Sequence, residues 1–234
     1  MSSQDSNRNL IGINSICSCI RFSGDNVLSF LNNLLISDLT ILQPKYCHYT
    51  ALCNPKGRII SSGWIYIESE ADILIVCPTN MQKILIDFFN MRKFRLKINI
   101  LPTNEIIAIN NNNLIPISTV NTKVTTSSIE SFYNFIFKAN LPWIDADNTE
   151  EFIPQHVNLD QHENIMSFTK GCYPGQEIIA RIKYLGSVKK RMVLLKARDK
   201  STLCQLVKLQ DTVSPIIHNK YTGYFLQQVI EKTN

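Results

Sequence analysis

Residues 170–177 read Lys170-Gly171-Cys172-Tyr173-Pro174-Gly175-Gln176-Glu177, and this run constrains the fold more than any other part of the chain. Pro174 and Gly175 are typical of a tight turn. The residues that follow, 177–184, carry isoleucines at the spacing of one helical face, which predicts a short amphipathic helix packed on a core. Gly186 is the expected C-terminal cap of this helix.

Cys172 lies just before the expected start of this helix, and Lys170 is two residues away. Unpaired backbone N–H groups and the helix dipole favour negative charge at a helix N-terminus. The pattern therefore predicts a thiol with a lowered pKa, which would be a better nucleophile or metal ligand than an ordinary cysteine. The alternative is a buried cysteine that packs as a small apolar residue. Residue chemistry alone favours neither.

The motif is longer than this run. It starts at Phe168 and continues to Ala180-Arg181, and further matching segments lie on both sides of it: Leu141-Pro142-Trp143-Ile144-Asp145, Glu151-Phe152-Ile153-Pro154-Gln155, Asn158-Leu159 and Lys189-Lys190-Arg191. In this order the segments closely resemble the YgfZ family. Its members are folate-binding relatives of the glycine-cleavage aminomethyltransferase, linked to iron–sulfur cluster maintenance and tRNA modification. The resemblance covers the last third of the chain closely and the first hundred residues more loosely.

The resemblance implies an α+β fold made of ferredoxin-like split βαβ units, a trimmed form of the aminomethyltransferase folate-binding fold with a short C-terminal β-barrel remnant. Residues 1–187 would form the folate-binding domain with a shortened second half, and residues 188–234 the small barrel-like segment. The order of expected elements in the first hundred residues, strand–helix–strand–strand–helix–strand, agrees with such a unit.

The function implied by the resemblance is that of an accessory protein. It would bind tetrahydrofolate, support iron–sulfur cluster assembly or repair, and thereby support iron–sulfur-dependent tRNA modification, with Cys172 as its reactive residue. The implied partners are folate, iron–sulfur enzymes or assembly factors and, indirectly, tRNA. The other candidates for folate binding or for fixing the motif loop are Lys170, Gly171, Tyr173, Gly175, Gln176, Glu177, Arg181 and Arg191.

Several of these candidates have simpler roles open to them. Gln176 and Glu177 suit hydrogen bonds to a pterin ring, but Glu in a first helical turn is favourable in any case. Arg181 and the cluster 189–191 suit the carboxylates of a folate through charge-assisted bonds. Alternatively they balance the acidic segment Asp145–Glu163, which has six acidic residues and no Lys or Arg, whereas residues 170–200 hold nine basic and two acidic residues.

The sequence leaves two other functions open, an aminomethyltransferase and an RNA-binding module. An aminomethyltransferase of this family uses a carboxylate after the hairpin that Asn54, Lys56, Gly57 and Arg58 match here. This chain continues with Ser61 and Ser62, and serine cannot act as a general acid or base at neutral pH. We therefore do not expect a classical aminomethyltransferase. The third function is a basic RNA-binding module, but the basic residues of 170–200 are not interleaved with aromatic residues as base stacking would require.

The composition is that of an ordinary globular protein, with 44% hydrophobic and 18% charged residues in 234. The polar start predicts no secretory signal, and polar residues interrupt the apolar stretch 27–42, so we expect no membrane span. Seven scattered cysteines without a CxxC pair indicate reduced thiols and a cytoplasmic location. His156 and His162 match no known ligand spacing, so no bound metal is expected.

The remaining expectations concern secondary structure. We expect strands at Ile16–Phe22, Tyr46–Cys53, Arg58–Glu68, Asp72–Cys77, Leu96–Leu101, Glu105–Asn110, Val188–Ala197, Leu203–Leu209 and Tyr221–Ile230. Helices are expected from residue 25 to about Ile36, after Pro78, and at Ile129–Asn140. The turn 54–57 joins two of the strands, and residues 116–128 give no clear prediction.

Overall fold

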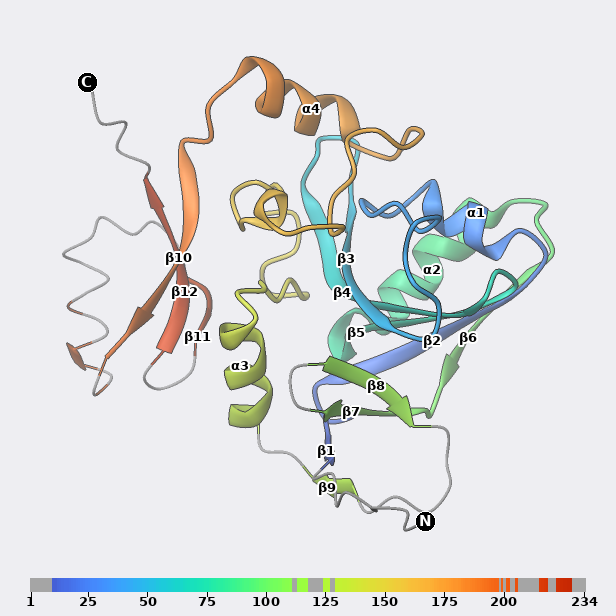
Figure 1. The fold of residues 1–234 in the computed structure, drawn as a ribbon, viewed down its shortest axis with the longest axis horizontal. Helices are drawn as coiled ribbons and strands as arrows, with labels where there is room; N and C mark the ends of the chain where they lie inside the picture. Colours follow the sequence, from blue (N-terminus) through green and yellow to red (C-terminus); the bar gives the residue numbers. More distant parts are fainter. Residues whose placement is uncertain are drawn as a thin grey trace, which may run out of the picture.

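The structure is a computed structural model, and it describes residues 10–110, 113–117, 124–126, 129–197, 199, 201–202, 205, 215–218 and 222–228. Its centre is a five-stranded antiparallel sheet in the order β3-β4-β5-β2-β6 (Figure 1). The strands are β2 (Cys17–Gly24), β3 (Cys47–Cys53), β4 (Ile59–Ser69), β5 (Asp72–Pro78) and β6 (Ile98–Thr103). All five were expected from the sequence, with bounds that differ by no more than two residues.

The topology differs from the ferredoxin-like unit. A ferredoxin-like sheet has four strands, whereas here three consecutive strands, β3, β4 and β5, separate the two helices. The element order is therefore β-α-β-β-β-α-β, and the ferredoxin-like description is not confirmed. What the structure does show is a mixed α+β fold around an antiparallel sheet.

Both faces of the central sheet are covered, because side chains alternate along each strand. On β4, Ile65 and Ile67 face one core and Trp64 faces the other. The first core lies under α1 (Val27–Asn32) and α2 (Gln82–Lys93), which follows the short 3₁₀ turn Thr79–Met81. Figure 1 shows both helices on the same side of the sheet.

The helix α1 ends four residues before the predicted end at Ile36. Beyond Asn32 the chain leaves the helix to pair with β3: Leu35 forms a bridge with Leu52, and Ile36 N–H donates to the carbonyl of Ala51 at 3.0 Å. The asparagine side chain of residue 32 accepts a hydrogen bond from Leu39 N–H at 2.8 Å. Tertiary pairing thus replaces the last helical turn.

The second core is aromatic. Trp64 lies with its ring centroid 5.1–6.3 Å from those of Tyr49, Phe132, Phe135 and Trp143. It is closed by α3 (Ile129–Lys138), as predicted, and by a small sheet in the order β8-β7-β1-β9. These strands are β1 (Leu10–Gly12), β7 (Ile106–Asn110), β8 (Asn113–Ile117) and β9 (Val124–Thr126).

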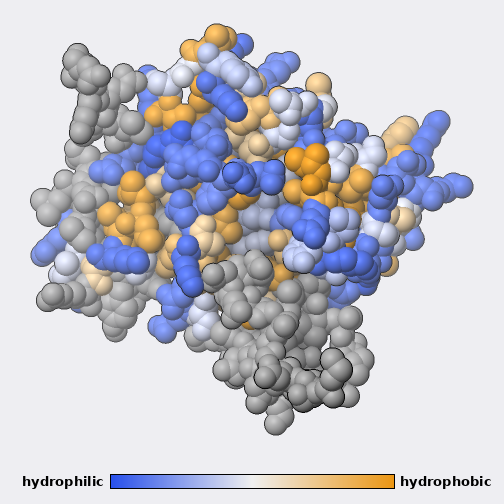
Figure 2. Space-filling model, in the orientation of Figure 1, coloured by the Kyte–Doolittle hydropathy of each residue, from blue (hydrophilic) through white to orange (hydrophobic). Residues whose placement is uncertain are grey.

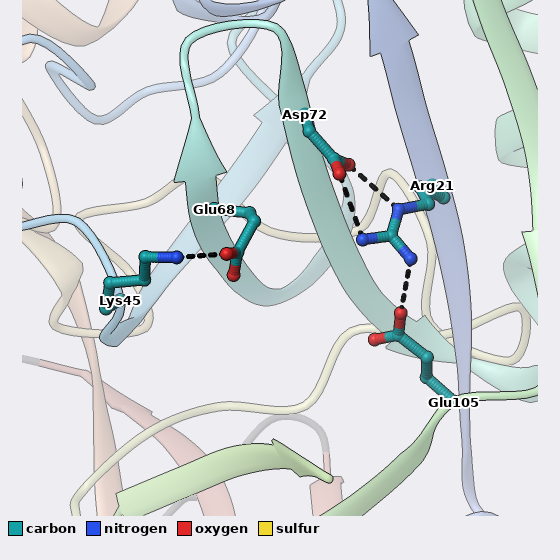
Figure 3. Close-up of polar contacts among 5 residues, drawn as sticks. All are labelled: Arg21, Lys45, Glu68, Asp72 and Glu105. Atoms are coloured by element: carbon teal, nitrogen blue, oxygen red, sulfur yellow. Dashed lines mark hydrogen bonds and ion pairs between the residues drawn. The ribbon is translucent and has the colours of Figure 1, made fainter. Parts of the chain in front are cut away.

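Ion pairs between charged side chains hold strand β2 to neighbouring strands. Figure 3 shows Arg21 donating to both carboxylate oxygens of Asp72, at 2.8 and 3.0 Å, and to Glu105 at 2.6 Å. These contacts join β2 to β5 and to the start of β7. A second pair in Figure 3, Lys45 with Glu68, ties the approach to β3 to the end of β4.

The C-terminal part contains α4 (Gln176–Leu185) and a three-stranded antiparallel sheet in the order β10-β12-β11 (Figure 1). Its strands are β10 (Lys190–Lys196), β11 (Pro215–His218) and β12 (Thr222–Gln228). The first and last of these confirm predicted strands. Of the strand predicted at 203–209 only Gln205 is described, and it is helical, so the prediction is wrong at this residue. The barrel remnant and the division at residue 187 stay predictions.

Within the described part of the chain, no helix has both the length and the apolar composition needed to cross a membrane.

Candidate functional site

The loop 165–175, which carries the sequence motif, is held against the turn that follows α1. Ser167 N–H donates to the carbonyl of Ile36 at 2.9 Å, and the Ser37 hydroxyl donates to the carbonyl of Ile165 at 2.6 Å. Within the loop, the Tyr173 hydroxyl donates to the carbonyl of Ser167 at 3.1 Å. The loop is therefore built onto a part of the chain more than a hundred residues away.

Lys170 is the central contact between the two segments. Its ammonium donates to the backbone carbonyls of Asn32 and Leu35 at 2.5 Å each, and to that of Ser37 at 2.6 Å. An ammonium has three donors and no acceptor, so this site uses its full capacity. Burial lowers the pKa of Lys170 to about 8, while the carboxylate of Asp38 acts in the opposite direction.

These three carbonyls follow from the local sequence. They belong to the end of α1 and the irregular turn after it, where carbonyl groups have no partner within the helix. A cation at this end also complements the helix dipole. The side chain of Lys170 thus serves as a structural cap for α1.

Cys172 lies at the tip of the loop and is exposed. The other described cysteines, residues 17, 19, 47, 53 and 77, are buried or half-buried. Burial raises the pKa of each of these five thiols, to about 12 for Cys47 and Cys77. Among the described residues, therefore, the motif cysteine is the one thiol that solvent reaches freely. The alternative, a buried cysteine that packs as a small apolar residue, is therefore wrong.

The helix after the loop starts at Gln176, within one residue of the prediction. Its N-cap is Gly175, with φ 82°, so Cys172 precedes the cap by three residues. The dipole effect is confined to the first turn of a helix, which places the thiol at its outer limit. At the other end, Gly186 is the C-cap as predicted, but it is extended, with φ −127°, and not left-handed.

Gly175 fixes the loop from the other side. A Cβ atom built on it would lie 2.5 Å from the carbonyl oxygen of Asn54 and 2.5 Å from the Cα atom of Gly57. The predicted turn 54–57 is confirmed, and the Asn54 side chain accepts hydrogen bonds from the N–H groups of Lys56 and Arg58. The β3–β4 turn and the motif loop therefore pack backbone against backbone.

The remaining motif residues fall into two groups, those exposed to solvent and those that face the protein interior. Gly171, Glu177 and Arg181 are exposed, whereas Tyr173 is buried and Gln176 reaches back to the carbonyl of Lys170 at 3.5 Å. Only Ile179 of the three helix isoleucines is fully buried. The motif thus has an inner set that anchors the loop, namely Lys170, Tyr173 and Gln176. Its outer set faces solvent and consists of Gly171, Cys172, Glu177 and Arg181.

Arg191 does not extend toward this outer set. Its guanidinium makes two parallel bonds to the carboxylate of Asp160, at 2.5 and 2.9 Å, and a third to the carbonyl of Gln155 at 2.8 Å. The expectation that Arg191 binds folate carboxylates is thus not supported by its contacts. They favour the alternative, charge balance with the acidic segment.

Segment 155–160 was not singled out by the sequence as a structural junction. The amide of Gln155 donates to the carbonyl of Ile179 in α4, and that of Asn158 donates to the carbonyl of Met192 in β10. Both side chains are buried. The available signal was that Gln155 and Asn158 lie in the segments Glu151–Gln155 and Asn158-Leu159, which match the family motif.

Ser61 and Ser62 are buried on β4 and bond to the backbone of Ile144. The Ser62 hydroxyl accepts from Ile144 N–H at 2.9 Å, and the Ser61 hydroxyl donates to its carbonyl at 3.3 Å. The cavity beside Ser61, Ser62 and Gly63 has a volume of about 20 Å³, which holds a single water. These residues therefore do not fit a bound pterin at this place.

His156 and His162 do not come together with other ligands. Among the described residues, no group of three or more His, Cys, Asp or Glu side chains is placed to hold a metal ion.

No protein-family model matches the chain. It is 28% identical over 197 residues to an uncharacterized protein of Haemophilus influenzae, which covers 76% of this chain and 70% of that protein. It is 52% identical over 58 residues to the tRNA-modifying protein YgfZ of Yersinia pestis, which covers 25% of this chain and 17% of that one.

Among solved structures, the glycine cleavage system aminomethyltransferase T of Bartonella henselae is similar with a TM-score of 0.56. The match covers 82% of this chain and 67% of that structure, at 11% sequence identity. At this identity the likeness concerns the fold. The fold is therefore of the aminomethyltransferase T kind.

Proposed function

We propose that the chain is a member of the YgfZ family and an accessory protein of iron–sulfur-dependent tRNA modification that acts through Cys172. One observation carries the proposal: an exposed thiol stands on a loop whose inner residues are anchored on both sides. An anchored loop presents its tip in a defined position, which a transient protein partner requires.

The chemistry proposed for Cys172 is that of a single thiolate ligand. Iron–sulfur clusters are held by cysteine thiolates, most often four. One exposed cysteine supplies one ligand, so the others would come from an iron–sulfur enzyme or an assembly factor in the cytoplasm. Arg181 and Glu177, exposed on the first turns of α4, would then contact the partner and not a small molecule.

Binding of tetrahydrofolate is proposed from the family and its fold. The residues around Ser61 do not fit a pterin, so a folate would bind elsewhere in the fold. Calorimetric titration with tetrahydrofolate decides this part: binding at micromolar strength supports a retained folate site elsewhere in the fold. No heat at millimolar ligand supports a scaffold that has lost it.

An aminomethyltransferase activity is not proposed. The hydroxyls of Ser61 and Ser62 are occupied by the backbone of Ile144, and neither is an acid or base at neutral pH.

The deciding experiment is complementation. A bacterial strain that lacks its own protein of this family is supplied with the wild type, with Cys172→Ser or with Cys47→Ser, and thiolated tRNA is measured by mass spectrometry. We expect Cys47→Ser to restore the modification and Cys172→Ser to fail at equal protein levels. Full restoration by Cys172→Ser would show that the thiol is not needed.

A further inference from the structure

The turn between α2 and β6 holds an aromatic ring in a costly conformation. Leu96 N–H donates to the carbonyl of Lys93 at 2.8 Å, which closes a four-residue turn with Phe94 at its second position. Phe94 has φ 44° and ψ −108°, the conformation of a type II′ turn, for which glycine is preferred. Its side chain is 81% exposed, so burial of the ring does not offset the strain. Strained residues of this kind are concentrated at functional sites.

Basic and apolar residues alternate around this ring. Residues 91–97 read Met91-Arg92-Lys93-Phe94-Arg95-Leu96-Lys97, and no acidic residue occurs between Asp87 and Glu105. Met91 is 74% and Leu96 41% exposed. Arg95 lies with its guanidinium carbon 5.3 Å from the centre of the Phe94 ring. In the basic segment 170–200 aromatic residues are not interleaved with the basic ones. In residues 91–97 an aromatic ring does lie among basic residues.

The simplest explanation for part of the charge is helix stabilisation. Arg92 and Lys93 stand in the last turn of α2, where cations complement the dipole, and Lys93 donates to the carbonyl of Ile98 at 2.9 Å. That account covers neither Arg95 nor Lys97, which lie beyond the helix and are exposed. It also gives no reason for an exposed aromatic ring at a glycine-like position.

A groove of about 550 Å³ opens beside the turn, within the size range of small-molecule sites. It runs between α1 and the end of α2, and its lining combines apolar groups, amides, a hydroxyl and one cation: Asn26, Ser29, Phe30, Asn33, Leu34, Arg92 and Leu96. This mixture suits a flat aromatic ligand with hydrogen-bonding edges and nearby negative charge. Figure 1 places the turn and α1 together at one edge of the molecule, remote from the three-stranded sheet, and Figure 2 shows hydrophilic and hydrophobic groups exposed side by side at that edge.

We propose that the α2–β6 turn and this groove form a binding site for single-stranded nucleic acid. One base stacks on Phe94, an adjacent base enters the groove, and Arg95 and Lys97 neutralise phosphates. Aromatic rings among basic residues are the usual means of binding single strands, because every base has a face that can stack. An anionic membrane would also attract the cations, but the amides and hydroxyl of the groove have no counterpart in acyl chains.

The site shares α1 with the motif loop. Asn32 at its end accepts the bond from Lys170, while Asn33 and Leu34, the next residues, line the groove. A strand bound in the groove would therefore lie close to the end of α1 on which the Cys172 loop is anchored. The site does not depend on the proposed role of the thiol, and Cys172→Ser should bind nucleic acid like the wild type.

The test is fluorescence anisotropy with fluorescein-labelled 12-nucleotide oligouridylate, oligothymidylate and a 12-base-pair RNA duplex at low salt. We expect both single strands to bind and the duplex to bind more weakly, because its bases are not free to stack. Preference between the two single strands distinguishes RNA from DNA as the natural ligand. The protein is used at up to about 100 µM, which equals the dissociation constant of weak non-specific binding. If neither single strand binds at this concentration, the proposal is overturned.

Phe94→Gly is the most informative variant. Glycine suits the φ of this position, so the denaturant midpoint should not fall, while the affinity for the single strands should drop at least about fivefold. Arg95→Glu with Lys97→Glu should weaken binding at least about tenfold and flatten its salt dependence. The matched control Lys138→Glu with Lys196→Glu makes the same change in net charge at exposed positions elsewhere and should alter affinity less than about twofold.

Three results would overturn the stacking site. Unchanged single-strand affinity in Phe94→Gly would show that the ring is not a platform. Equal losses in the charge-reversed pair and its control would show attraction by net charge alone. Co-sedimentation with phosphatidylcholine vesicles containing phosphatidylserine, lost in Phe94→Gly while oligonucleotides fail to bind, would assign the turn to a membrane surface instead.

Discussion

The α-carbon of Gly175 lies so close to the carbonyl oxygen of Asn54 that an added Cβ atom would approach that oxygen to 2.5 Å. Real Cβ atoms are essentially never found at this distance from backbone atoms. The contact joins the start of α4 to the turn between β3 and β4, and it determines where the motif loop sits on the central sheet.

Gly175→Ala should therefore destabilise the protein and displace the loop. The Cβ atom clashes with backbone that cannot rotate away, and φ 82° is unfavourable for alanine. We expect a loss of about 2–3 kcal/mol in the free energy of unfolding, measured by urea denaturation. Gly171→Ala is the matched control four residues away, because its Cβ atom would meet nothing within 4 Å. Equal stability of the two variants would contradict the close packing.

Lys170→Met tests the cap on α1. Methionine keeps most of the length of the side chain but leaves the carbonyls of Asn32, Leu35 and Ser37 without their donor. We expect a loss of about 2–3 kcal/mol in the free energy of unfolding, since unpaired buried acceptors are costly. Lys189→Met, at an exposed position, should change it by less than about 0.5 kcal/mol. A small effect of Lys170→Met would mean that water satisfies these carbonyls.

The regular elements could be predicted because their signals are local. Alternation on β2 to β6 and the helical stripe of α3 depend on neighbouring residues, and these elements were located within two residues. The extent of α1 was not, since its end depends on pairing between Leu35 and Leu52. The short strands β1, β8, β9 and β11 were not predicted either, because pairing with neighbouring strands holds each of them more than its own pattern does.

The candidate site was predicted in identity but not in arrangement. The motif indicated Cys172 as a functional residue. It did not distinguish the motif residues that face the protein interior from those that face solvent. Lys170 was expected to act on the thiol, whereas it bonds to carbonyls up to 138 positions away, a relationship without any local signal. The 91–97 segment did have a local signal, its alternating basic and apolar residues, but the same residues also fit the end of a helix and the start of a strand.

Replacing Arg191 tests the pairing with Asp160. The Arg191 side chain is 24% exposed and that of Asp160 is 18% exposed, and the guanidinium makes two parallel bonds to the carboxylate. A double-mutant cycle with Arg191→Ala and Asp160→Ala should give a coupling energy of roughly 1–2 kcal/mol. Lys189→Ala paired with the same aspartate change should give none. A coupling near zero for Arg191 would return it to the residues available for an anionic ligand.

His156 predicts a dependence of stability on pH. Burial, followed by the positive charges of Lys190, Arg58 and Arg191, lowers the pKa of His156 to about 4 from its ordinary 6.5. Between these values the unfolded chain binds more protons than the folded one, so stability rises with pH across this window and is lost as the solution is acidified from 6.5 toward 4. Its buried Nδ1 atom has no hydrogen-bond partner in the described part of the chain, so a proton there would be an unpaired charge.

The measurement is the urea midpoint at pH 7 and pH 5. His156→Gln should reduce the difference between the two midpoints relative to the wild type. His162→Gln, which removes an imidazole at the surface, serves as control and should keep the wild-type difference. The same slope in all three proteins would assign the acid sensitivity to other groups.

Of the described thiols, that of Cys172 should react fastest in the folded protein. Under native conditions at neutral pH, iodoacetamide should alkylate Cys172 at least about tenfold faster than Cys47 or Cys53, because only the thiolate reacts and burial raises the pKa of the other two. Mass spectrometry of tryptic peptides over a time course measures each rate. In about 6 M urea the difference should disappear, since unfolding exposes all the thiols equally. Gly175→Ala should change the Cys172 rate under native conditions while Gly171→Ala should not, if the anchored loop sets the position of the thiol. Native labelling of Cys47 or Cys53 as fast as Cys172 would contradict the burial on which this prediction rests.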